Sequence, residues 1–524
     1  MDTLVLENYT HIPVRLITEE LGSGSALYND MTEVARNYKK YKEGCDFLTE
    51  GSNGDYTPSS VAFKKMANLI NKEARFMFGK TPEVTIELLN KPKMSDADKE
   101  ALSVYQGFVD TVLKVNGFGK NLIKAAKDCF IGKRVAIMLN FNPEDGVTVS
   151  FVPALNFVYE LDEVNADTLK KFVAYIKTNS GAASIDQRIF KKKYVMENGA
   201  CVVYETVYDG SGNIVEKEMR IVTLFTYIPA VVILNDGLLG NPFGESEVEL
   251  LEDYEALYSK IANADVDAER KGMNSITYAI DADPKTTKGL STAPGAFWDI
   301  HSDPNTAMEN MKATLGKLES SMSYSAPLKE TLQRISTIMH DSVDSPDISL
   351  ESMQGVITSG KALRAVYWAL IVRCDEKMKA WAPGLEFICS TIIEGARLYP
   401  EAARVHLEQS VPDGYEYRVH VDNLYPLPEE EVEEKTMDIM EVNAQTMSKK
   451  SYMMKWRGLT SDEADEELKQ IALEKQLLED SFSLPPFNVD ETEPKPSGEE
   501  NPEGEGEGEN STGKGAEEPE DVTE

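Results

Sequence analysis

Apolar side chains recur at helical spacing over a long segment in the middle of the chain. Between residues 246 and 272 they recur at helical spacing, at Val248, Leu251, Tyr254, Leu257, Tyr258, Ile261 and Val266. This spacing places them on one face of an α-helix. Ser246 and Glu249 predict a capping box at its start, and Gly272 predicts its end. At 1.5 Å per residue the helix would be about 39 Å long, a rod that a single compact domain seldom needs.

The same helix is rich in acidic side chains. Residues 243–273 carry nine acidic side chains against three basic ones, and the acids are dense at Glu249, Glu252, Asp253 and Glu255. In a ring of identical subunits, the apolar stripe would contact neighbouring rods and the acids would face a central opening. We therefore predict that these four acids lie on the channel face of such a ring.

The pattern elsewhere predicts a mixture of helices and strands. Helical spacing indicates helices at residues 28–43, 60–78, 327–343, 359–381, 385–398, 429–443 and 460–479, and Ser95 with Asp98 predicts the start of another. From residue 134 the apolar period changes to two, which predicts strands at residues 135–141, 147–152, 172–178, 202–208 and 214–222. Residues 209–213 predict a hairpin turn, and the proline-containing residues 274–324 are predicted to be irregular. The fold class is therefore α+β and mainly helical.

An acidic break separates two of the predicted helices. It contains Asp341, Asp344, Pro346, Asp347 and Glu351, and no basic residue follows before Lys361. An ordinary solvated helix–helix loop would also be charged. The long helix at residues 246–272 is also poor in cations. The helix and the acidic break together suit a surface that stays near a polyanion without adhering to it.

The overall charge limits the possible partners. The formal net charge is −35, and residues 490–524 contribute fourteen acids and two bases to it. Nonspecific binding to nucleic acid needs clustered lysine and arginine, so the net charge argues against it. Residues 486–524 contain too few apolar groups to fold, and we expect a disordered acidic tail there.

The sequence contains no recognisable catalytic, cofactor or metal motif. The five cysteines are scattered and are expected to be reduced and buried. The run from Asn116 to Lys120 resembles a phosphate loop only weakly, and a break between helices is the better interpretation. Carboxylate pairs such as Asp281 and Asp283 leave a Mg²⁺-dependent nuclease as an alternative. No signal peptide is present, and the apolar run 224–234 is too short to cross a bilayer, so an intracellular soluble protein is expected.

Four short stretches together resemble the portal proteins of long-tailed, siphophage-like bacteriophages, which are the head–tail connectors of these phages. They are residues 68–82 (NLINKEARFMFGKTP), 241–247 (NPFGESE), 359–363 (SGKAL) and 458–460 (GLT). Each stretch is short and is a structural motif, not a chemical one. The resemblance rests on the order in which the four stretches occur. It spans residues of about 25 to 480 and excludes the acidic tail.

The resemblance implies a portal-type ring subunit, with twelve copies around a DNA channel at one capsid vertex. It assigns residues 1–242 to the first part of a mixed α/β wing, 243–273 and 326–343 to two stem helices, 274–325 to an irregular clip, 344–358 to a tunnel loop, 359–425 to the tunnel helix and the rest of the wing, 426–485 to a helical crown, and 486–524 to the tail.

The resemblance also implies partners and a location. They are a terminase motor, later head–tail adaptor proteins, the major capsid and scaffolding proteins, and passing double-stranded DNA without sequence specificity. Phe297 and Trp298 are the expected partner contact at the clip, although burial within the clip is an equal alternative. The chain would be a virion protein, present in the host cytoplasm during assembly, and not an enzyme. An acidic, non-channel scaffold or adaptor protein is the alternative from another class.

Overall fold

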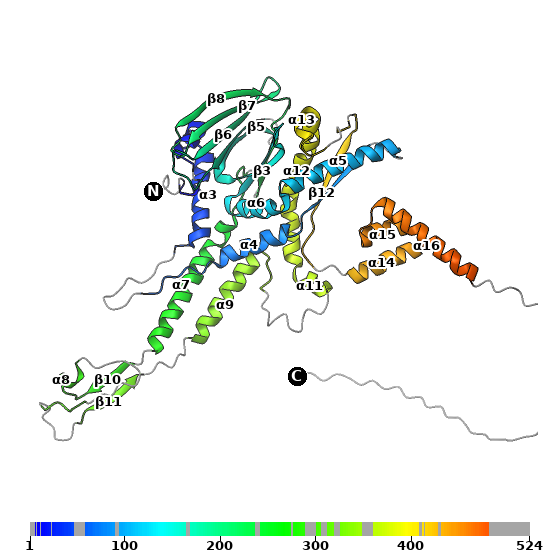
Figure 1. The fold of residues 1–524 in the computed structure, drawn as a ribbon. Coiled ribbons are helices and arrows are strands. Elements are labelled where there is room, and N and C mark those ends of the chain that lie inside the picture. The colour runs from blue at the N-terminus through cyan, green and yellow to red at the C-terminus, as the bar shows by residue number, and fades with distance from the viewer. Residues whose placement is uncertain are drawn as a thin grey trace, which may run out of the picture. The chain divides into compact units, whose positions relative to one another are not determined.

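The computed structural model describes residues 6, 8–10, 12–22, 24–46, 58–89, 94–163, 168–235, 241–273, 276–288, 300–304, 312–318, 325–347, 360–407, 411–412, 414–427 and 431–481. The chain divides into two compact units, residues 1–429 and 430–524, each of which is described by itself. Helices and strands are mixed in the first unit (Figure 1). The predicted α+β class is confirmed.

The N-terminal third of the chain contributes five helices to the described part of the first unit. They are α2 (Val14–Leu21), α3 (Ala26–Glu43), α4 (Lys65–Phe78), α5 (Asp96–Val115) and α6 (Phe118–Gly132). Helices α3, α4 and α6 pack against one another through buried apolar side chains such as Met66, Ile70 and Leu122. The predicted capping box of Ser95 and Asp98 is present at the start of α5. The glycine at 117 adopts a left-handed conformation between α5 and α6, so the helix-break interpretation of residues 116–120 is confirmed.

The first unit also contains several antiparallel sheets. The larger has the strand order β4 (Phe157–Leu161), β5 (Leu169–Thr178), β6 (Arg188–Glu197), β7 (Ala200–Asp209) and β8 (Ile214–Val222). A second sheet has the order β3 (Gly146–Pro153), β2 (Arg134–Asn142) and β9 (Ala230–Leu234), and β1 (Glu83–Leu88) pairs with β12 (Tyr417–Asp422). The hairpin turn at residues 209–213 is confirmed, because the Asp209 carboxylate accepts hydrogen bonds from the backbone N–H groups of Ser211 and Asn213.

Strand β6 is not predicted by the alternation of apolar residues, because three consecutive lysines interrupt it. Lys191 and Lys193 lie within 2.6 and 3.2 Å of the Glu20 carboxylate, and Lys171 on β5 lies 2.6 Å from it. Burial opposes ionisation of Glu20, but the lysines outweigh that effect and hold its pKa at about 2. The Glu20 carboxylate on α2 therefore compensates the charges of lysines on strands β5 and β6.

Two long helices run side by side in the first unit (Figure 1): α7 (Glu247–Met273) and α9 (Ser325–Ser342). Residues 274–324 between them were expected to be irregular. They contain helix α8 (Pro284–Thr287) and strands β10 (Ile276–Ile280) and β11 (Thr314–Leu318), which pair in antiparallel fashion. The irregular interpretation is therefore wrong for the two strands.

Helix α11 (Gly360–Val366) is followed by α12 (Trp368–Leu398), which continues through Pro383. Two separate helices were predicted, because a proline in a helix removes one backbone hydrogen bond and usually marks a boundary. That boundary is wrong. Trp381 and Leu385, on either side of the proline, are both buried in the same core, and their burial keeps the two halves in one helix. A short helix, α13 (Pro400–Ala403), follows.

The second unit contains α14 (Glu431–Asn443), α15 (Lys449–Arg457) and α16 (Ser461–Ser481). The Trp456 indole donates a 2.7 Å hydrogen bond to Asp438, which links α15 to α14. Lys450 forms a 2.7 Å ion pair with Asp465, which links α15 to α16. None of the helices in the described part of the chain is both long and apolar enough to cross a membrane.

Candidate functional site

A segment outside helices and strands, residues 59–63, lies along helix α7 and is bound to it by polar side chains at four-residue spacing. The Ser59 N–H donates to Asp267, the Val61 N–H to Asn263 and the Phe63 N–H to Ser259. Four helical residues advance about 6 Å, and two extended residues advance about 6.6 Å. The two repeats match closely enough for every second N–H of the segment to find an acceptor. A helix from residue 60 was predicted, and its first turn is wrong because α7 supplies these hydrogen bonds instead.

The same row of side chains ends at the beginning of helix α4. Glu255 accepts a 2.9 Å hydrogen bond from the backbone N–H of Met66, in the first turn of that helix. Residue Lys64, at the N-cap position, adopts a left-handed conformation and its side chain makes no cap. A carboxylate on α7 therefore caps a helix nearly two hundred residues earlier in the chain, where the helix dipole favours negative charge.

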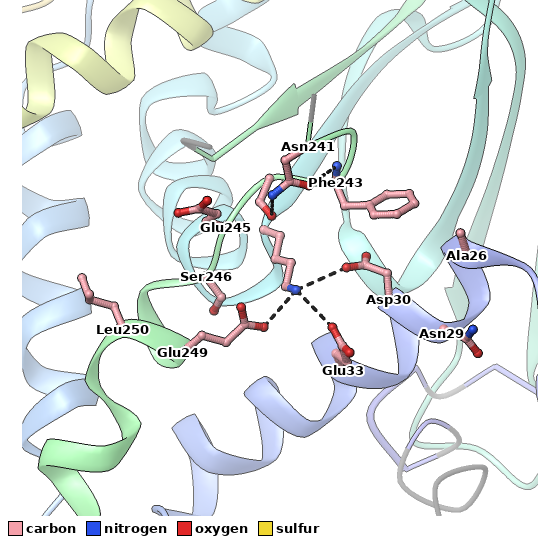
Figure 2. Close-up of a pocket in the computed structure, with 12 residues that line it drawn as sticks. Ala26, Asn29, Asp30, Glu33, Asn241, Phe243, Glu245, Ser246, Glu249 and Leu250 are labelled. Atoms are coloured by element: carbon pink, nitrogen blue, oxygen red, sulfur yellow. Dashed lines mark hydrogen bonds and ion pairs between the residues drawn. The ribbon is translucent and has the colours of Figure 1, made fainter. Parts of the chain in front are cut away.

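Helix α7 begins at a cavity of about 650 Å³ lined by α3, by Lys133 and by residues 241–250 (Figure 2). The Lys133 ammonium lies 2.9 Å from Glu249, 3.3 Å from Asp30 and 3.4 Å from Glu33. Burial disfavours this charge, but Glu249 and Asp30 together raise the pKa of Lys133. The predicted capping box of Ser246 and Glu249 is wrong, because Glu249 is directed toward Lys133. Ser246 alone caps the helix, accepting from the N–H of Val248.

The four acids predicted for a channel face have different surroundings in the subunit. Glu249 is occupied by Lys133, and Glu252 pairs with Lys40. Glu255 is fully buried, so within the subunit its carboxylate does not face solvent. Asp253 is exposed. The assignment of these acids to a channel wall stays a prediction, and Asp253 is the member whose surroundings suit it best.

Four charged side chains meet in the core where α4, α7 and α12 cross. Arg373 of α12 donates to both carboxylate oxygens of Glu247 at 2.7 and 2.8 Å, and to Glu73 at 3.0 Å. Lys377, one turn further along α12, lies 2.5 Å from Glu247 and 2.7 Å from Glu73. The charges sum to zero. We call these four residues the buried quartet.

The members of the buried quartet differ in how well they are compensated. Burial opposes ionisation of Glu247, but Lys377 and Arg373 outweigh it and lower the pKa of this carboxyl. Burial and repulsion from Glu247 raise the pKa of Glu73, whose buried Oε2 atom has no hydrogen-bond partner among the residues that the structure describes. A buried charge left without its partner is costly. The quartet therefore fixes three helices to one another, and removal of any member would expose an uncompensated charge.

The acidic break after α9 touches this quartet. The Asp344 carboxylate lies 3.7 Å from Arg373, and Asp344 itself has a left-handed backbone with φ of 50°. His340, buried at the end of α9, has its Nδ1 atom 3.1 Å from the Ser345 carbonyl and its Nε2 atom 3.6 Å from Asp347. Two of the predicted tunnel-loop acids are thus held by the subunit's own side chains.

The remaining predicted site residues are distributed as follows. Asp341 is exposed and Pro346 is half-buried. Glu351, Phe297 and Trp298 lie outside the described residues, so the predictions for them stay untested. An exposed tryptophan does occur elsewhere, because Trp368 at the start of α12 is 65% exposed.

Sequence reasoning did not identify Glu73, Arg373 or Lys377. For Lys377, the sequence did contain one indication of burial. Lys377 stands directly before Met378 on a helix whose apolar stripe includes Cys374 and Trp381, and a lysine so close to a buried stripe needs an acid. Which acid it meets depends on helices far apart in the sequence.

Within the described ranges no three His, Cys, Asp or Glu side chains are grouped as a metal site would require. All five cysteines are free and buried, as predicted, and burial raises the pKa of the Cys129 and Cys374 thiols well above the ordinary value.

Comparison with known proteins agrees with this arrangement of long paired helices on a mixed α/β body. A comparison with curated proteins gave no match. The family model described as "Phage portal protein, SPP1 Gp6-like" matches residues 26–477, most of the chain. The chain therefore belongs to the phage portal protein family.

Proposed function

We propose that this chain forms a ring of twelve subunits at one vertex of a phage capsid, through which double-stranded DNA is packaged and later ejected. The observation that carries the proposal is the family match over residues 26–477. In this proposal α7 and α9 are the stem helices, residues 274–325 the clip, 344–358 the tunnel loop, 359–425 the tunnel helix with the rest of the wing, and 426–485 the crown.

The channel would act as a passive conduit with an adjustable constriction. Exposed acids such as Asp253, repeated around a ring, would form a negative band. At a Debye length of about 10 Å, a duplex sliding past would be repelled from the wall. The tunnel loop would move relative to the buried quartet, with the Asp344–Arg373 pair joining the loop to α12.

Energy for packaging would come from a separate terminase motor, which would dock on the clip and later be replaced by head–tail adaptor proteins. The major capsid and scaffolding proteins would contact the outside of the ring. The chain itself would have no enzymatic role. In infected cells it would be found in the host cytoplasm before it becomes part of the virion.

The mass of the purified particle tests the ring. One chain has a mass of 58.3 kDa, and a dodecamer would be about twelve times heavier, which light scattering resolves. Negative-stain images should show rings with a central hole. Solitary particles of single-chain mass would contradict the ring and favour an acidic adaptor protein instead. Metal-dependent cleavage of DNA by the purified chain would favour a nuclease.

A further inference from the structure

Helices α4 and α6 carry a local cluster of cations, although the chain as a whole is strongly acidic. Lys120, Lys124 and Lys127 follow one another at spacings of four and three on α6, so they share one face of that helix. Lys72 and Arg75 are three residues apart on α4, which packs against α6. We call these five residues the α4–α6 basic face.

The cations of this face outnumber the acids close to them in the described part of the subunit, where Asp128 lies near Lys124 and Lys127. Four of them are exposed and Lys127 is half-buried, and none forms a salt bridge or side-chain hydrogen bond within the described residues. Burial and the neighbouring Arg75 lower the pKa of Lys127. Like charges this close repel one another, so the face is suited to an anionic ligand.

The acids of the two helices compensate these five cations only in part. Each helix is described along its whole length, and each contains one acidic residue. Glu73 is wholly buried in the quartet. Asp128 accepts a 2.9 Å hydrogen bond from the Tyr38 hydroxyl and lies among Lys42, Lys124 and Lys127, whose positive charges lower its pKa in opposition to burial. The exposed surface of both helices is therefore positive, in a chain whose net charge is −35.

The composition of the face favours a phosphate backbone over an acidic protein. Protein interfaces are depleted of lysine at their centres and need apolar or aromatic anchors. Neither α4 nor α6, both fully described, exposes a large apolar side chain. Phosphates, in contrast, are neutralised by lysine and arginine alone. The start of α6, where Gly117 leaves the helix without a side-chain cap, adds backbone N–H groups near Lys120.

We propose that the α4–α6 basic face binds the phosphate backbone of double-stranded DNA without reading its sequence. The inference rests on the proposed function for its setting, because DNA is concentrated at the vertex where a portal stands. The inference goes beyond a passive channel. In the proposed function, acidic surfaces repel the duplex and keep it mobile. The α4–α6 basic face would instead bind the duplex through an electrostatic contact that salt weakens. Nothing in the face reads bases, so the contact would tolerate any sequence.

The test uses the full chain and a short fluorescent duplex, with binding followed by anisotropy between about 0.05 M and about 0.2 M salt. The variant Lys72→Glu/Lys120→Glu/Lys124→Glu reverses three exposed, unpaired cations of the face. The control Lys99→Glu/Lys329→Glu/Lys379→Glu reverses three exposed lysines on other helices and has the same net charge. Thermal melts of both variants verify folding.

We expect the face variant to bind about tenfold or more weakly at low salt, and its salt slope to be smaller by about 3. The control should bind as the unmodified chain does. Equal binding by the two variants, or no binding by the unmodified chain, would overturn the proposal. So would a polyglutamate peptide that binds the face as tightly as the duplex, because the site would then suit an acidic protein.

The oligomeric state separates this inference from the proposed function. Particle mass is measured on the same samples. A ring that forms normally in the face variant while DNA binding is lost supports the inference. A chain that never forms rings contradicts the proposed function, and the comparison of the two variants still decides whether the face binds DNA.

Discussion

The Oδ2 atom of Asp344 lies 3.7 Å from the Nη1 atom of Arg373. Arg373 also binds Glu73 and Glu247, so this contact joins the segment after α9 to the three helices that the buried quartet holds together. The Asp344 side chain is half-exposed, whereas both glutamates are buried. The contact is therefore the weakest link of the network and the one that can open without unfolding the core.

Removal of the Asp344 charge should loosen the acidic break and leave the fold intact. An exposed ion pair contributes about 0.2–1 kcal/mol, so Asp344→Asn should speed amide exchange at residues 343–347 by about two- to fivefold. Asp341→Asn, which changes an exposed carboxylate of the same segment, is the control. Equal exchange in the two variants would mean that Asp344 does not anchor the break. If the portal proposal holds, Asp344→Lys with Asp347→Lys should also slow packaging or ejection.

Removal of the Lys377 charge should destabilise the core strongly. Lys377→Met leaves two buried glutamates with Arg373 alone, and breaking a buried pair costs about 3–5 kcal/mol. Chemical denaturation should show this loss. Lys379→Met changes an exposed lysine on the same helix and should shift stability by less than about 0.5 kcal/mol.

A second substitution tests the electrostatic explanation for Lys377. Adding Glu73→Gln to Lys377→Met removes the glutamate whose pKa is raised by burial. The double variant should therefore lose less stability than the sum of the two single variants. Strict additivity would show that Lys377 acts through packing, and not through its charge.

The segment along α7 should open when its acceptors are removed. Asn263 accepts from the Val61 N–H and donates to the Val61 carbonyl, and each hydrogen bond contributes about 0.5–1.5 kcal/mol. Asn263→Ala should therefore speed amide exchange at Val61 and Phe63. Lys260→Ala, on the exposed side of the same helix, should leave both amides protected. Unchanged protection in Asn263→Ala would assign the stability of the segment to other contacts, such as the ring contact of Phe63 with Tyr258.

Asp128 should make stability depend on pH. Burial raises its pKa to about 6, although the Tyr38 hydrogen bond and nearby lysines oppose the rise. Because the folded pKa exceeds the unfolded one, the contribution of Asp128 is fully present below about pH 4 and is lost as pH rises through 6. At neutral pH the ionised group costs up to about 3 kcal/mol.

Asp128→Asn removes this cost while keeping an acceptor for Tyr38. The variant should be more stable than the unmodified chain at pH 8, and the gain should shrink at pH 5. Thermal melts at the two pH values measure the difference. A gain that is the same at both values, or a loss at pH 8, would contradict the raised pKa.

Local patterns in the sequence were enough for most elements and for the fold class. The apolar stripe from Val248 to Val266 predicted α7 within a residue at its end, because helical periodicity depends only on neighbours along the chain. The capping box of Ser95 and Asp98 was found for the same reason. The short stretches that indicated the portal family are likewise local, and the family match confirms them.

Contacts between distant segments account for what local patterns missed. Residues 60–63 are not helical because Ser259 and Asn263 of a later helix accept the N–H groups of Phe63 and Val61. Glu249 does not cap its helix because it forms an ion pair with Lys133. The buried quartet exists only when α4, α7 and α12 cross. Helical periodicity depends on residues that are close in the sequence. The partner of a buried charge depends instead on tertiary packing, which brings together residues hundreds of positions apart.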